Sequence, residues 1–384
     1  MLADLGASGS EVAELLAYGE NTFDLRALAT VRELPLPDEP FIEFWAPRVA
    51  EARERGAAAV LREHLPQLHF PIRSGMSANA DYLAATRRGV PPDILPEATG
   101  LDLPHRERIG LELHLSPAGH LPVIVVRGRE EFVALVQALS ARNEPRPVAA
   151  AQGALAVSGY VNWSRIRARR EAWQRAGRSA RETATWEEEM ARLKARPESY
   201  QDRFVLLSDG PYSAVPAAEM GLGEEEWRAL SLAIRRDHEC AHYFTRRLLG
   251  SMRNRLLDEL IADYAGIAAA AGRFRADWLR RFLGLEDFPR LRTGGRLEVY
   301  RGEPPLSDGA FRVLAAVAHA AAASLERFDQ AELGEGPRTV VEQALAIATI
   351  ASHRAEDLAA PDGAAALGST YRELVRRFDA GGGA

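Results

Sequence analysis

Residues 223–250 read GEEEWRALSLAIRRDHECAHYFTRRLLG and carry the clearest fold signal in this chain of 384 residues. Their apolar residues recur at the spacing of a helical face, with glutamates at the start and arginines near the end. The helix dipole favours acidic side chains at an N-terminus and basic ones at a C-terminus. The stretch therefore predicts a helix from about Glu224 to Leu249, ended by Gly250, a residue typical of helix C-termini.

Two histidines lie four residues apart on this predicted helix, within the segment 237–242, DHECAH. Residues i and i+4 share one helical face, so the side chains of His238 and His242 can reach a single metal ion. Glu239 lies one position round the helix, beside the open side of such an ion. This HExxH arrangement is typical of zinc sites in which the glutamate is the general base. The alternative is two ordinary histidines on the surface of a charged helix.

A second helix is expected to follow the Gly-Ser pair at 250–251, where glycine fits a helix C-terminus and serine fits the N-cap of the next helix. The two helices would then form an antiparallel hairpin. Counting outward from the turn brings Glu259 level with His242, and Asp263 level with His238. Glu259 becomes a candidate third ligand, and Asp263 a candidate acceptor for the second ring nitrogen of His238. Each carboxylate could otherwise be an ordinary polar residue of the helix surface.

The two helices together resemble the gluzincin superfamily of zinc peptidases, which join HExxH to a downstream ExxxD, here residues 259–263, ELIAD. The resemblance covers roughly residues 200–272. It implies one catalytic Zn²⁺, with ligands His238, His242 and Glu259, general base Glu239, and Asp263 as the hydrogen-bond partner of His238.

Hydrolysis of an amide also needs a donor for the developing oxyanion, and here the sequence leaves several candidates. His319 lies in an Ala-rich helical pattern and His353 in a later one, and the alternative for each is an ordinary core or surface histidine. Tyr300, Arg301 and Tyr212 are weaker candidates for the same role.

Few segments have the pattern of strands. Residues 110–126 fit a hairpin that precedes a helix near 129–142, residues 154–163 fit a further strand, and Phe204–Leu207 fits a short buried strand. The last of these could be the sheet edge that pairs with an extended peptide substrate, although burial would explain its apolar character equally well. After about Gly272 the pattern is helical almost to the end of the chain.

These patterns predict a predominantly helical α+β protein. We expect a zincin-like catalytic domain with a small sheet, an active-site helix hairpin and a helical C-terminal lobe. The expected division is an N-terminal mixed α/β region of unknown role (1–145), the catalytic core (146–272) and the C-terminal lobe (273–384), in line with a length above that of most single cores.

Composition narrows the functional classes. The net charge of −6 argues against nucleic acid as a partner. Cys240 is the only cysteine, which excludes an intrachain disulfide. No apolar run reaches the roughly 20 residues of a membrane span, and the acidic first 20 residues lack the pattern of a signal peptide. We therefore expect a cytoplasmic protein without a membrane partner. An arginine-rich, Ala-rich chain whose one lysine is Lys194 suggests a G+C-rich bacterial source.

The leading hypothesis is a zinc metallopeptidase that acts on a peptide or protein through a metal-activated water and a glutamate base. A zinc-dependent tailoring or non-peptide hydrolase would use the same residues. A catalytically silent, zinc-stabilised binding protein would keep the ligands without turnover. The sequence leaves the substrate and the oligomeric state open.

Overall fold

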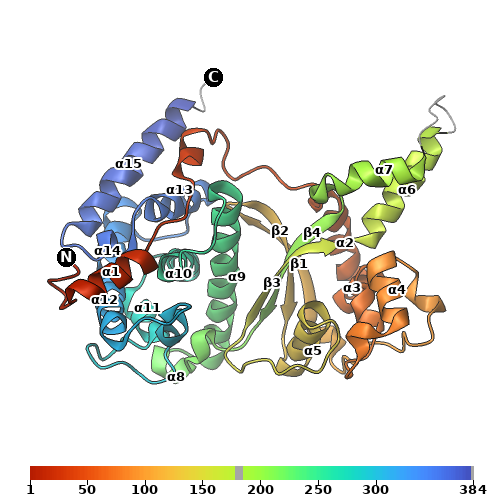
Figure 1. Ribbon diagram of the computed structural model, residues 1–384, viewed down its shortest axis with the longest axis horizontal. Coiled ribbons are helices and arrows are strands. Elements are labelled where there is room, and N and C mark those ends of the chain that lie inside the picture. Colours follow the sequence, from red (N-terminus) through yellow and green to blue (C-terminus); the bar gives the residue numbers. More distant parts are fainter. Residues whose placement is uncertain (178–184, 382–384) are drawn as a thin grey trace. The chain divides into compact units, whose positions relative to one another are not determined.

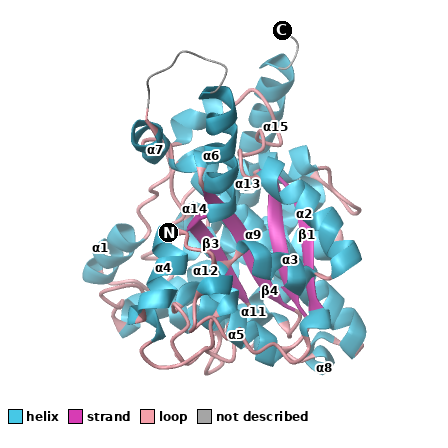
Figure 2. Cartoon of the chain, turned by 90° about the vertical axis from the view of Figure 1, so that its right-hand side faces the viewer, coloured by secondary structure: helices cyan, strands magenta, loops and turns pink. Residues whose placement is uncertain are grey.

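The computed structural model describes residues 1–177 and 185–381, which form many helices and one small sheet (Figure 2). The predicted α+β class, predominantly helical, is confirmed. The chain divides into two compact units: residues 1–37, 115–119 and 211–384, called here the helical unit, and residues 38–114 and 120–210, called the sheet unit. These units describe packing, and the division into three functional regions stays a prediction.

The sheet has four strands within the described residues, in the order β1-β2-β4-β3. Their bounds are β1 Ile109–Ser116, β2 Gly119–Val126, β3 Ala154–Val161 and β4 Gln201–Ser208. β4 runs parallel to β2, with Val205 opposite Val123, and antiparallel to β3, with Phe204 opposite Val157. The predicted hairpin and both predicted single strands are confirmed.

The expectation that Phe204–Leu207 forms a sheet edge is wrong. These residues belong to β4, which has a hydrogen-bonded strand on each side. All four side chains are buried, as is usual for a central strand covered on both faces. The alternative explanation, burial, accounts for the apolar run, and β4 offers no free edge to a peptide.

The sheet unit also contains the helices α2 Ile42–Arg55, α3 Ala57–His64, α4 Ala80–Arg88, α5 Arg129–Ser140, α6 Trp163–Gly177 and α7 Trp186–Lys194.

A buried carboxylate joins the strand β4 to the helices α2 and α6. Asp202 of β4 accepts hydrogen bonds from Trp45 of α2, from Asn162 and from Arg165 of α6. These partners compensate the cost of burying its charge.

The helical unit contains the helices α1 Gly9–Tyr18, α8 Ala217–Met220, α9 Glu224–Leu249, α10 Leu256–Ala271, α11 Ala276–Leu283, α12 Asp308–Glu332, α13 Val340–Ala351, α14 Ala355–Leu358 and α15 Gly363–Gly381. α9 and α10 pack along each other (Figure 1). Their approach is close at Gly266, where a Cβ would lie 2.4 Å from the carbonyl oxygen of Ile234. Only glycine fits there.

The connection between α9 and α10 differs from the predicted turn. α9 ends at Gly250 in the left-handed conformation, with φ 74°, as expected. However, α10 begins at Leu256, so Ser251 is not its N-cap. The Ser251 hydroxyl instead accepts a hydrogen bond from the Arg253 amide inside a connector of residues 251–255. The connection between the two helices is therefore longer than the two-residue turn that was predicted.

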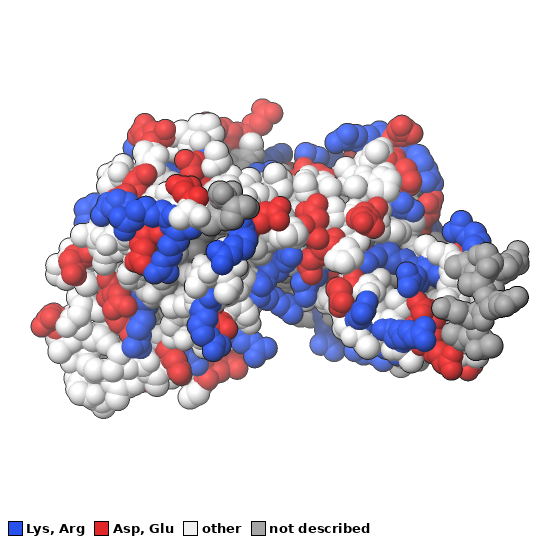
Figure 3. Space-filling view, turned by 90° about the horizontal axis from the view of Figure 1, so that it is seen from above, with Lys and Arg blue, Asp and Glu red and all other residues white. Residues whose placement is uncertain are grey.

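Within the described ranges, no helix combines the length and the apolar character that a membrane span requires. On the face displayed in Figure 3, positive and negative side chains are interspersed. Cys240 is buried in the core of the helical unit.

Candidate metal centre

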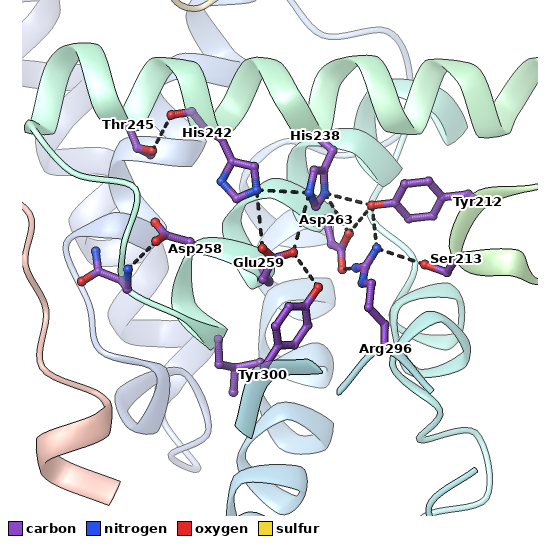
Figure 4. Close-up of polar contacts among 12 residues, drawn as sticks. Tyr212, Ser213, His238, His242, Thr245, Asp258, Glu259, Asp263, Arg296 and Tyr300 are labelled. Carbon is purple, nitrogen blue, oxygen red and sulfur yellow. Dashed lines mark hydrogen bonds and ion pairs between the residues drawn. The ribbon is translucent and has the colours of Figure 1, made fainter. Parts of the chain in front are cut away.

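Three side chains of the helix pair converge on one point. His238 and His242 project from the same side of α9 toward Glu259 of α10 (Figure 4). The two Nε2 atoms are 3.1 Å apart, and each lies 3.7 Å from a carboxylate oxygen of Glu259. In four-coordinate zinc sites with bonds of about 2.0–2.2 Å, neighbouring ligand atoms are roughly 3.3–3.6 Å apart. The observed spacing therefore fits three ligands around one ion.

The tautomer of His238 also suits a ligand. Its Nδ1 lies 3.0 Å from Oδ1 of Asp263, a carboxylate with no exposed surface. Because a carboxylate oxygen can only accept, Nδ1 carries the proton, which leaves the lone pair of Nε2 facing His242 and Glu259. A histidine that donates its other N–H to a carboxylate is the usual arrangement around bound zinc. The structure thus brings His238 and Asp263 together as the spacing predicted.

Asp263 is held by further donors. The Tyr212 hydroxyl donates to its Oδ1 at 2.7 Å, and the Arg296 guanidinium pairs with its Oδ2 and donates to the Tyr212 oxygen at 2.9 Å. Tyr212 begins the 3₁₀ segment Tyr212–Ala214, and Arg296 begins the segment Arg296–Arg301. Burial opposes ionisation of Asp263, but the charge of Arg296 and the bond to His238 outweigh it and keep its pKa well below the ordinary value.

Glu259 is oriented by Tyr300, whose hydroxyl donates to its Oε2 at 2.7 Å. Tyr300 is held in turn by the N-terminal helix α1. The Tyr18 hydroxyl donates to the Tyr300 carbonyl at 2.6 Å and accepts the Leu256 amide at 3.3 Å. Helix α1 therefore contacts, through Tyr18, both the segment that carries Tyr300 and the first residue of α10.

Glu239 lies on α9 next to His238, and its carboxylate makes no hydrogen bond to another residue in the part of the chain that the structure describes. Burial raises its pKa, and the nearby charge of Glu259 adds to this rise. A carboxylate with a raised pKa, whose oxygens make no hydrogen bond to another described residue, suits a general base.

The two histidines differ in their pKa. Burial, helped by the neighbouring His238, lowers the pKa of His242 to about 4, so this ring is neutral near pH 7, the form that binds metal. Burial also acts to lower the pKa of His238, but Asp263, Glu259 and Glu239 outweigh it and the pKa rises. The negative charge of these carboxylates would also favour a dication bound at His238.

The structure does not bring the other histidine candidates to this centre. The ring of His319 stacks on Phe288, with centroids 4.6 Å apart, and Nε2 of His353 lies 3.0 Å from the Thr370 hydroxyl. Arg301 pairs with an aspartate of α12. Among the described residues, none of the three contacts a member of the cluster. His319 and His353 are therefore explained by the alternative given above, an ordinary core or surface histidine.

A family model described as "Family of unknown function (DUF7005)" matches residues 1–362. This chain belongs to that family. The match includes both units and every residue of the candidate centre. No curated protein and no solved structure matches the chain. Its function must therefore be argued from the site.

Sequence reasoning missed Arg296 and ranked Tyr212 and Tyr300 below the two histidines. Arg296 and Tyr300 are four residues apart in one short segment, but no known motif marks that spacing. Arginine is also abundant in this chain, so a single arginine carries little signal. Only the fold places these three side chains beside Asp263 and Glu259.

A neighbour of Glu259 predicts a pH dependence of stability. Asp258 is buried, its Oδ2 accepts the Asn254 amide, and its Oδ1 has no hydrogen-bond partner among the described residues. Burial raises its pKa to about 7. The folded state then binds more protons than the unfolded state between about pH 4 and pH 7, so stability falls as the pH rises through this window.

We expect Asp258→Asn to remove this loss, so that the variant gains stability over the wild type by up to about 4 kcal/mol between pH 4 and pH 8. Urea unfolding at several pH values measures the difference. Asp277→Asn, at an exposed aspartate of α11, is the control and should follow the wild type at each pH. A stability difference for Asp258→Asn that does not change with pH would contradict this assignment.

Proposed function

We propose that this chain is a zinc-dependent metallopeptidase of the gluzincin type, which hydrolyses a bond of a peptide or protein. The observation that carries the proposal is the convergence of two imidazole nitrogens and a carboxylate at 3.1–3.7 Å. Two nitrogens and one oxygen form a ligand set typical of catalytic zinc. When bound, zinc supplies a water whose pKa lies near neutrality and polarises the scissile carbonyl.

Glu239 would act as the general base. Its carboxylate accepts the proton released as the nucleophile attacks and passes it to the leaving amine. The raised pKa and the free oxygens of Glu239 support this role. Glu239 is not one of the three candidate ligands, so its oxygens stay available for proton transfer.

We propose Tyr300 as the donor to the developing oxyanion. Its hydroxyl lies beside the candidate ligand Glu259, and its one described acceptor is that carboxylate. Arg296 is less suited, because its guanidinium is engaged by Asp263 and Tyr212 and holds them in place. His319 and His353 have no part in this proposal.

Tyr300→Phe is expected to lower kcat by about 10²–10³-fold, the usual cost of losing one oxyanion donor, with a much smaller effect on KM. The three ligands are unchanged, but Glu259 loses the hydrogen bond from Tyr300, so zinc affinity should fall about 10–100-fold and kcat is measured with zinc in excess. Steady-state kinetics with elemental analysis measures both. Tyr371→Phe, a buried tyrosine outside the centre, is the matched control. Unchanged kcat in Tyr300→Phe would remove Tyr300 from the mechanism.

The substrate class is tested by incubating the zinc-loaded chain with a complex peptide mixture and identifying new termini by mass spectrometry. New termini that are absent with Glu239→Gln would support peptide hydrolysis. If zinc is bound and no peptide is cleaved, the proposal of a peptidase fails and a non-peptide hydrolase or a binding protein takes its place.

We further propose that the protein acts in the cytoplasm, because a lone buried cysteine gives no sign of disulfide-forming conditions. We also propose that it has no nucleic-acid partner.

A further inference from the structure

A cavity of about 420 Å³ lies within the helical unit, away from the three candidate ligands. It is enclosed by the segment 28–34, by α9, and by α13 and α15, which neighbour each other in Figure 1. Its volume is within the range of about 300–1,000 Å³ that small-molecule sites occupy. The cavity is open to solvent on one side, where the exposed Arg32 and Arg377 lie, so a ligand can enter it.

Most residues that line this cavity have apolar side chains. Phe244 and Leu248 contribute from α9, Phe378 from α15, and Leu34 from the N-terminal segment. α13 contributes Ala344 and Ala348, whose small side chains leave the space open. These side chains offer an alkyl chain a carbon surface on several sides, and its transfer from water onto them would be favourable.

The charged side chains of the lining are both arginines, Arg32 and Arg377. Both are exposed, so they mark the side of the cavity that faces solvent. Arg32 makes no hydrogen bond or ion pair with another described residue. Arg377 pairs with Glu373, one turn earlier on α15, but both side chains are more than half exposed, and such pairs are weak. Two arginines and one glutamate leave a net charge of +1 at this side.

We infer that the cavity binds a monocarboxylate with a medium-length alkyl chain, in the manner of a fatty acid. The alkyl chain lies along Phe244, Leu248 and the alanines of α13, and the carboxylate accepts hydrogen bonds from Arg32 and Arg377. A single negative charge matches the net charge at the open side, and the guanidinium fork suits the two carboxylate oxygens. No residue of the lining belongs to the proposed zinc centre, so this site does not depend on the proposed function.

The test uses decanoate, below its micelle concentration, in a calorimetric titration of the full chain. Saturable binding of one decanoate per chain is expected, with or without EDTA. Decan-1-ol has the same chain without the charge and should bind at least about 10-fold more weakly, since charge-assisted hydrogen bonds are each worth about 1.5–3 kcal/mol.

Two variants locate the site. The double variant Arg32→Gln/Arg377→Gln should weaken decanoate binding at least about 10-fold, whereas Arg376→Gln, at an exposed arginine of α15 outside the lining, should leave it unchanged. Ala348→Phe should fill the cavity and abolish binding. The inference is overturned if decanoate does not bind, if decan-1-ol binds equally well, or if the arginine variant binds like the wild type. Binding to anionic lipid vesicles without binding of free decanoate would overturn it as well.

Discussion

Replacing Glu239 by glutamine is expected to leave zinc bound and to reduce kcat by at least about 10²–10⁴-fold, the usual contribution of a general base. Glutamine keeps the shape of the side chain but cannot accept the proton. The zinc content should not change, because Glu239 is not one of the three candidate ligands, His238, His242 and Glu259. Steady-state kinetics on a peptide found in the mass-spectrometric screen, combined with elemental analysis, measures both quantities.

Glu225→Gln is the matched control, since this exposed glutamate lies in the first turn of the same helix, far along α9 from the cluster. It should have wild-type kcat. If Glu239→Gln hydrolyses as fast as the wild type, Glu239 is not the base. If the wild type and Glu239→Gln both hold zinc and neither turns over any substrate, the binding-protein alternative is favoured over an enzyme.

The second large effect is expected from His238→Ala, on both zinc and stability. The variant loses one ligand and leaves the buried Asp263 without one of its donors. Removing one partner of a buried charged pair costs about 3–5 kcal/mol, which corresponds to a drop in Tm of roughly 4–6 °C for a chain of this size. The loss of bound zinc adds to this drop, because a ligand that binds only the folded state stabilises it.

Thermal unfolding with and without EDTA separates the two contributions. EDTA should lower the Tm of the wild type and leave that of His238→Ala unchanged. His319→Ala, at a histidine outside the cluster, is the control and should respond to EDTA as the wild type does. An equal response of His238→Ala and the wild type to EDTA would show that the stabilising metal is bound elsewhere.

The parts of the fold that the sequence predicted correctly depend on local physics. α9 has the predicted bounds, because its dipole pattern and Gly250 act within the helix itself. The strands were found for the same reason, since alternation and apolar runs are local. The position of β4 in the sheet was not predictable, because its neighbours β2 and β3 come from distant parts of the chain.

The candidate metal centre likewise contains residues that local patterns predicted and residues that only the fold brings together. The face shared by His238 and His242 follows from helix geometry alone. The positions of Glu259 opposite His242 and of Asp263 opposite His238 were predicted by counting residues from a two-residue turn. In the structure these residues are opposite each other, but the connector is longer and ends at Arg255, whose φ is 52°. Arg296 comes from a separate segment, and no pattern in the sequence joins it to Asp263.

The most direct test of the proposed centre is the zinc content of the purified chain after loading with zinc and removal of excess metal, measured by elemental analysis beside the double variant His242→Ala/Glu259→Ala. We predict one zinc per wild-type chain and at least about 100-fold weaker zinc binding in the double variant, since even a single outer-shell partner is typically worth 10–100-fold. A wild-type chain without zinc, or a double variant that holds zinc as firmly as the wild type, would contradict the assignment of His238, His242 and Glu259 as its ligands.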